Sequence, residues 1–243
     1  MTALTENDTS PAVAWGPIDI VQTIGAVVLT ILITFVGAAV ILGATRTTGD
    51  ISTRAGAATL AVSLVAELAM VVAVWWFAVR RHGASWTAIG FRSPNTSRTA
   101  IGVPITLFAA FFAVVLFSFA VFELGLRDPE DSSIPKELLS GSLLLALFCT
   151  SVVVAPLMEE TFFRGFVFGG LRRSWGGMRA GAASAVIFGL AHPDLFLIVP
   201  VTILGVLLVL LYVWTDSLWG PIAVHAMFNA LQLLPELLPG AVA

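Results

Sequence analysis

Seven apolar runs, separated by short polar breaks, constrain the fold of this chain more than any other feature. The runs cover residues 20–44, 55–79, 99–122, 138–171, 180–192, 195–214 and 218–234. A helix of about 20 predominantly apolar residues crosses the hydrocarbon core of a bilayer. The pattern therefore predicts an all-α fold, a polytopic transmembrane helix bundle with seven spans.

Composition agrees with lipid as the main solvent of this chain. Hydrophobic residues make up 58% of the sequence and charged residues 11%, whereas soluble domains carry about 25% charged residues. The net charge is −3 and there is no basic patch, so we expect no nucleic-acid partner. The single cysteine, Cys149, excludes an intrachain disulfide and a cysteine-based zinc cluster, and its apolar surroundings favour a buried side chain.

Basic residues gather in alternate breaks and so predict the orientation of the bundle. Seven of them follow the second and fourth runs: Arg80, Arg81, Arg92, Arg98, Arg172, Arg173 and Arg179. These two breaks are an even number of crossings apart, so they lie on one side of the membrane. The positive-inside rule makes that side cytoplasmic, with a cytoplasmic N-terminus and an outward C-terminus, as expected for a plasma-membrane protein.

We divide the chain into four parts. Residues 1–19 are a polar cytoplasmic tail, 20–137 the N-terminal transmembrane helices, 138–234 a membrane core that holds most of the polar groups, and 235–243 a short C-terminal tail. No Lys or Arg precedes Arg46, so a cleaved signal peptide is not expected and the first run is predicted to be a retained span.

Ionisable side chains inside the apolar runs are the informative anomaly, because each costs about 2.5–3.5 kcal/mol at the centre of a membrane helix. The ionisable residues are Glu67, Glu159, Glu160, Arg164, His192 and His225. Asn229 is a further polar residue inside a run. Glu159 lies thirteen residues before Arg172, and His192 lies thirteen residues after Arg179. At 1.5 Å per residue both side chains are roughly 20 Å from the basic side. At the same rise per residue, His225 and Asn229 lie roughly 14–20 Å from that side. These polar groups are therefore predicted to lie at one depth in the bilayer.

Two of the spacings favour specific contacts. Glu160 and Arg164 are four residues apart on one helix, which suits a salt bridge. His225 and Asn229 are also four apart and can point at one spot. Structural roles remain open: the ion pair can hold helices together, and Asn229 can bond between helices. Glu67 has no visible partner, so packing and proton-linked roles are both open.

The same groups permit two kinds of hydrolytic chemistry. A carboxylate beside an imidazole can activate water for attack on a carbonyl, and His or Asn donors can stabilise the resulting oxyanion. Alternatively, Glu159, His192 and His225 have the ligand count of a catalytic zinc site, so the cofactor is either one zinc ion or none. The residues alone do not decide between the two schemes.

The motifs around these residues resemble the CPBP intramembrane proteases, the group that contains the type II CAAX prenyl endopeptidases and bacteriocin-immunity homologues. The chain has E-E-x3-R at Glu159–Arg164, F-x3-H at Phe188–His192 and H-x3-N at His225–Asn229, in that order on separate runs. The resemblance covers residues 138–234. Relatives usually have eight spans, which keeps eight as the alternative to seven.

The resemblance implies a role for each matching residue. Glu159 and His192 would activate the attacking water, His225 and Asn229 would form the oxyanion hole, and Glu160 with Arg164 would order the catalytic carboxylate. The expected activity is intramembrane endopeptidase, glutamate-type or metallo, acting on membrane-associated peptides that include CAAX-like or lipid-anchored ones.

Two other functions fit the same polar groups. One is a non-catalytic scaffold or bacteriocin-immunity protein that binds a partner through the same cavity. The other is a small transporter that uses Glu67 and the carboxylate pair for proton coupling, although no inverted repeat is visible.

Overall fold

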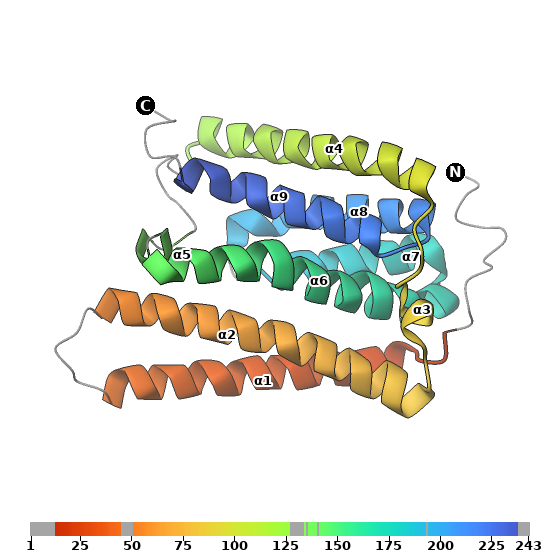
Figure 1. Ribbon diagram of the computed structural model, residues 1–243, viewed down its shortest axis with the longest axis horizontal. Helices are drawn as coiled ribbons and strands as arrows, with labels where there is room; N and C mark the ends of the chain where they lie inside the picture. Colours follow the sequence, from red (N-terminus) through yellow and green to blue (C-terminus); the bar gives the residue numbers. More distant parts are fainter. Residues whose placement is uncertain are drawn as a thin grey trace.

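The computed structural model describes residues 13–44, 51–126, 134, 136–139, 141–192 and 194–237. Throughout this part of the chain the regular secondary structure is helical, and the helices form one bundle (Figure 1). The predicted all-α, polytopic fold is confirmed. Arg46, Arg127, Pro193 and most of both predicted tails lie outside the described residues.

The helices begin and end close to the predicted limits of the apolar runs. In chain order they are α1 (Pro17–Ala44), α2 (Ile51–Val74) with its π-helical continuation η2 (Trp75–Arg80), α3 (Trp86–Ile89), α4 (Thr96–Glu123), the 3-10 turn η3 (Lys136–Leu139), α5 (Gly141–Phe148), the π-helix η4 (Cys149–Val154), α6 (Ala155–Glu160), the π-helix η5 (Thr161–Phe168), α7 (Gly169–Leu190), α8 (Leu195–Thr215) and α9 (Trp219–Leu237). The short helix α3 and the three π-helices were not predicted.

Five stretches of helix are long and apolar enough to cross a membrane, and one of them contains two of the predicted runs. That stretch, Gly141–Leu190, is 50 residues long. Gly176 interrupts it with φ 75° and ψ 160°, a conformation that glycine adopts without steric cost. Figure 1 shows the chain running along α5 and α6, then returning along α7. The fourth and fifth predicted runs are thus separate passes. The seventh run corresponds to α9, which is not one of the five stretches.

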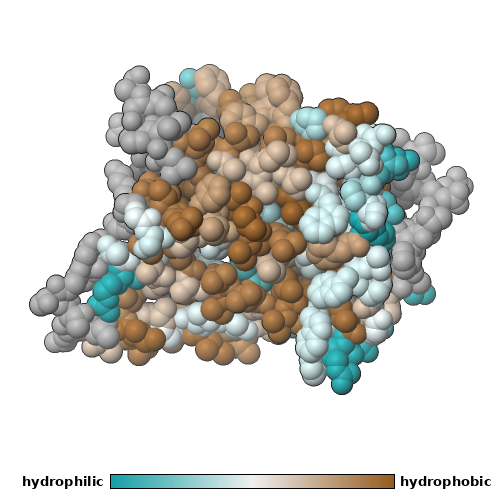
Figure 2. All heavy atoms as spheres, viewed as in Figure 1, coloured by the Kyte–Doolittle hydropathy of each residue, from teal (hydrophilic) through white to brown (hydrophobic). Residues whose placement is uncertain are grey.

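The outside of the bundle is apolar, as lipid requires. Large side chains such as Ile33, Phe108 and Leu145 are 64%, 74% and 66% exposed. Figure 2 shows hydrophobic residues over the middle of the face that it presents, and hydrophilic residues gathered at the end where α3 lies. The chain is an integral membrane protein. Cys149 is exposed rather than buried, so the predicted burial of this thiol was wrong; it begins η4, whose residues include none that are buried.

The polar end of the bundle joins two breaks that are distant in sequence. An ion pair of 3.0 Å connects Arg92 Nη2 to Asp216 Oδ1, and Arg98 Nη1 donates to the Trp214 carbonyl oxygen at 3.1 Å. The Leu218 amide donates to the Gly90 carbonyl oxygen at 3.0 Å. The breaks after α2 and after α8 therefore share one side, as the alternation of crossings requires.

Close contact between α7 and α8 depends on glycine. A Cβ at Gly189 would overlap Thr202 Oγ1 and lie 2.8 Å from the Ile198 carbonyl oxygen. We expect Gly189→Ala to lower the free energy of unfolding by about 1–3 kcal/mol, because the two helices must separate. The control is Gly25→Ala, since Gly25 has nothing within 4 Å of its position for a Cβ. Equal stability of the two variants in unfolding by sodium dodecyl sulfate would contradict this account.

Candidate active site

A buried charge cluster connects the fourth and seventh predicted runs. Arg164 Nη1 donates to Glu160 Oε1 at 2.8 Å, which is the predicted i, i+4 pair. The same oxygen of Glu160 lies 2.9 Å from His225 Nδ1 on α9. Glu160 and Arg164 are 0% exposed and His225 is 3% exposed. The three side chains therefore form a dry, hydrogen-bonded unit that joins α6, η5 and α9.

Arg164 lies in a π-helical segment that is buried along its whole length. All eight residues of η5 are buried, and π-helical turns inside α-helices are frequent at functional sites. Because a buried guanidinium needs several partners, Arg164 also donates from Nη2 to the Gly205 carbonyl oxygen at 3.3 Å, and its Cζ lies 4.3 Å from the centre of the Phe188 ring. Arg164 thus holds the cluster against α7 and α8.

Glu159 differs from its neighbour in having no cationic partner at hydrogen-bonding distance among the interactions recorded for the described residues. Its Oε2 lies 3.8 Å from His225 Nε2, beyond a hydrogen bond. This oxygen is buried and accepts no hydrogen bond within the described part of the chain. Glu159 therefore has a carboxylate oxygen beside an imidazole and available to a water, whereas Oε1 of Glu160 is held by both Arg164 and His225.

His192 is connected to this cluster through the Phe188 ring, which contacts both imidazoles. The Phe188 ring makes edge contacts with both imidazoles, at 5.3 Å to the His192 ring centre and 5.6 Å to that of His225. His192 Nδ1 lies 3.0 Å from the Phe188 carbonyl oxygen. A carbonyl only accepts, so Nδ1 carries the proton and Nε2 is the basic nitrogen of the neutral ring. His192 lies two residues after the end of α7 and is part-buried.

Asn229 bonds to a helix backbone, not to the carboxylates. Its Nδ2 donates to the Ser151 carbonyl oxygen at 2.8 Å. Ser151 lies in η4, where the amide of Ala155 bonds five residues back to Thr150. With the same spacing of five residues, the Ser151 carbonyl would need the N–H of residue 156. That residue is Pro156, which has no N–H. Asn229 therefore supplies the missing donor and fastens α9 to η4, the interhelical role that the sequence left open.

We expect Asn229→Ala to lower the free energy of unfolding by about 1–3 kcal/mol, because it leaves the Ser151 carbonyl without a donor. Adding Pro156→Ala restores a backbone N–H at the required position and is expected to recover part of the loss. Gln232→Ala is the control, since Gln232 is exposed on the same helix. A double variant no more stable than Asn229→Ala would contradict the proline explanation.

The candidate zinc ligands do not form a metal site in this arrangement. Within the described residues no group of three or more His, Cys, Asp or Glu side chains is placed to hold a metal ion, and this includes Glu159, His192 and His225.

Glu67 on α2 belongs to the cluster, although the sequence showed no partner for it. Its side chain is 7% exposed and is hydrogen-bonded to the Glu159 carboxyl. One sequence signal could have found it. Glu67 lies thirteen residues before Arg80, the same spacing that separates Glu159 from Arg172. The depth argument applied to Glu159 therefore places Glu67 at the same level.

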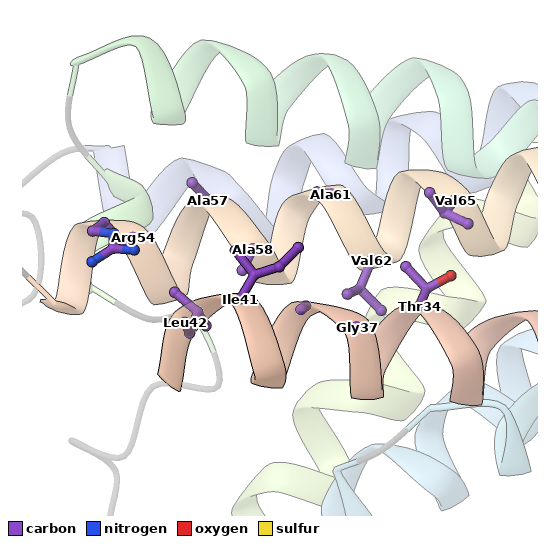
Figure 3. A pocket seen from close by; sticks show the side chains of 11 residues that line it. Thr34, Gly37, Ile41, Leu42, Arg54, Ala57, Ala58, Ala61, Val62 and Val65 are labelled. Atoms are coloured by element: carbon purple, nitrogen blue, oxygen red, sulfur yellow. The ribbon is translucent and has the colours of Figure 1, made fainter. Parts of the chain in front are cut away.

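A groove elsewhere in the bundle is separate from this cluster. It has a volume of about 570 Å³ and runs between α1 and α2, where small apolar side chains and Arg54 line it (Figure 3). None of the cluster residues lines this groove. The candidate site is therefore the polar cluster between α2, α6, η5, α7 and α9.

Comparison with known proteins places these motifs in a family. Residues 141–231, which hold all three motifs, match the family described as "Type II CAAX prenyl endopeptidase Rce1-like". The matched segment makes up less than half of the chain. The resemblance predicted from the motifs is confirmed.

Two bacterial relatives extend the match. The chain is 31% identical over 153 residues to "Putative membrane peptidase YdiL" of Bacillus subtilis, covering 60% of this chain and 62% of that protein. It is 39% identical over 93 residues to "Membrane-embedded CAAX protease MroQ" of Staphylococcus aureus, covering 35% and 37%. The chain thus matches less than two thirds of the length of either relative. No solved structure shows a significant match.

Proposed function

We propose that this protein is a membrane-embedded endopeptidase that hydrolyses peptide bonds of membrane-associated substrates. The observation that carries the proposal is the pair of adjacent carboxylates with different partners: Glu160 is tied to Arg164 and His225, while an oxygen of Glu159 remains available beside His225 Nε2. The Rce1-like segment and the names of the two relatives support the same reaction class.

The chemistry follows from these positions. Glu159 removes a proton from a water molecule, and the hydroxide attacks the scissile carbonyl carbon. His225 donates its Nδ1–H to Glu160, so it must carry a second proton on Nε2, as an imidazolium, to donate a hydrogen bond to the developing oxyanion. The proton taken from water then passes to the leaving amine, either from Glu159 directly or through Nε2 of His192, and the C–N bond breaks. Asn229 acts mainly by positioning α9, and its second amide hydrogen is available to the oxyanion.

The finer assignments belong to the same proposal. The substrates are peptides held at the bilayer, including lipid-anchored ones and CAAX-like ones, the latter as the name of one relative suggests. The end that carries α3 and the seven arginines faces the cytoplasm, and the membrane is the plasma membrane. A cytoplasmic N-terminus follows from the excess of basic residues at that end.

Hydrolysis in labelled water tests the proposal directly. The purified protein is reconstituted in lipid nanodiscs with a library of membrane-anchored peptides in H₂¹⁸O, and products are identified by mass spectrometry. We expect cleavage that places one ¹⁸O in the new carboxylate. The Glu159→Gln variant, prepared identically, controls for contaminating proteases and is expected to form product at least about 10²-fold more slowly.

The rival functions give different results in this experiment. A scaffold or immunity protein would cleave nothing, and its biological activity would survive Glu159→Gln. A proton-coupled transporter would show flux that depends on Glu67 and no labelled product. Either result would refute the endopeptidase.

A further inference from the structure

We propose that Glu67 is a positioning residue of the active site, which holds the Glu159 carboxyl by a hydrogen bond between the two carboxyl groups. This inference rests on the proposed function, because it assigns Glu67 a part in orienting the group that activates water. Glu67 lies outside residues 141–231, the segment that matches the family. The site would therefore be completed by the N-terminal half of the chain.

The packing of α2 places Glu67 against the site. Helix α2 contacts α6, which carries Glu159, and also η5. Glu67 shares one face of α2 with Met70 and Val74, and these side chains are 7%, 8% and 0% exposed. This face is turned to the bundle interior, whereas Leu68 and Val72 are 48% and 61% exposed. A carboxyl on the interior face of a membrane helix is costly without a partner.

Glu159 is the partner of that carboxyl. The two side chains are hydrogen-bonded. One oxygen of each, Oε2 in both cases, is buried and receives no hydrogen bond from an N–H or hydroxyl donor in the described part of the chain. Two ionised carboxylates would repel one another, and a carboxyl can donate only when it is protonated. One proton shared between the two groups removes that repulsion.

The neighbours decide which carboxyl carries that proton. Glu159 lies 3.8 Å from His225 Nε2, so the imidazole is placed beside Glu159 and not beside Glu67. We therefore assign the proton to Glu67, as donor, and the charge to Glu159, as acceptor. A carboxylate fixed in this way keeps Oε2, the oxygen beside His225 Nε2, available to the water. Such positioning matters, because a displacement of about 1 Å can cost about 10²-fold in rate.

Two substitutions separate hydrogen bonding from packing. Glu67→Gln keeps the length and a donor, because the amide nitrogen can bond to Glu159. Glu67→Met keeps the length but has no donor. On the substrate found in the labelled-water assay, we expect kcat of Glu67→Gln to stay within a few-fold of the wild type. We expect kcat of Glu67→Met to fall about 10²-fold, with KM little changed. Ser63→Ala, at an exposed position on the same helix, is the control.

A spectroscopic measurement tests the carboxyl pair without using activity. The wild type is expected to show the infrared C=O band of a buried protonated carboxyl, and Glu67→Gln is expected to lose it. If Glu67→Gln loses the band but the wild type cleaves no peptide, the proposed function fails and the carboxyl pair stands. If the band persists in Glu67→Gln, or if Gln and Met variants have equal kcat, the positioning role of Glu67 is refuted.

Discussion

Replacing Arg164 by Met is expected to lower the free energy of unfolding by about 3–5 kcal/mol, because it leaves Glu160 as a buried charge without its cation. Both side chains are 0% exposed, and their ion pair is 2.8 Å long. Arg164 also donates to the Gly205 carbonyl oxygen and packs on the Phe188 ring. Its removal therefore loosens η5 from both α7 and α8. Equilibrium unfolding in sodium dodecyl sulfate measures the loss.

A double-mutant cycle identifies the cause of that loss. Glu160→Gln combined with Arg164→Met removes both charges, so the double variant is expected to be more stable than Arg164→Met alone. Arg173→Met is the matched control, because Arg173 is exposed, and its effect is expected to stay within about 0.5 kcal/mol. An Arg164→Met variant as stable as the control would show that the pair is not desolvated.

The transmembrane helices were predictable because lipid imposes a length on each apolar run. The first run was predicted at 20–44 and the helix spans Pro17–Ala44; the sixth was predicted at 195–214 and the helix spans Leu195–Thr215. The π-helices were not predictable from hydropathy, because a shift from i, i+4 to i, i+5 bonding does not change which residues are apolar. Pro156 was a signal for one of them, since it removes a donor just after η4.

The site was predictable only where its contacts are local. The Glu160–Arg164 pair follows from helix spacing and is present. The contact between Glu160 and His225 joins residues 65 apart in sequence, and nothing in the spacing indicated that α9 would pack beside α6. The same applies to Glu67, because the order of runs along the chain does not show that α2 and α6 are neighbours. The spacing to the basic breaks predicts the depth of a residue, but it carries no information on lateral position.

The adjacent carboxylates Glu159 and Glu160 should respond differently to the same substitution. Glu159→Gln is expected to lower kcat about 10²–10⁴-fold, since an amide cannot take a proton from water. Its stability should change little, because Glu159 makes no ion pair shorter than 3.8 Å. Glu160→Gln is expected to destabilise the protein, because Arg164 then lacks its anion. Initial rates and unfolding in sodium dodecyl sulfate, measured on both variants in the same lipid, separate the two effects.

The comparison is informative because the two residues have the same side chain and lie next to one another. Gln at position 160 can still accept from Arg164 and from His225 Nδ1, so the imidazole keeps its orientation and much of the activity should survive in molecules that remain folded. Glu123→Gln is the control for changing a carboxyl to an amide, since Glu123 is exposed at the end of α4. If Glu160→Gln abolished cleavage with unchanged stability while Glu159→Gln remained active, the water would be activated by Glu160. The buried ion pair would then be part of the catalytic base and not its support.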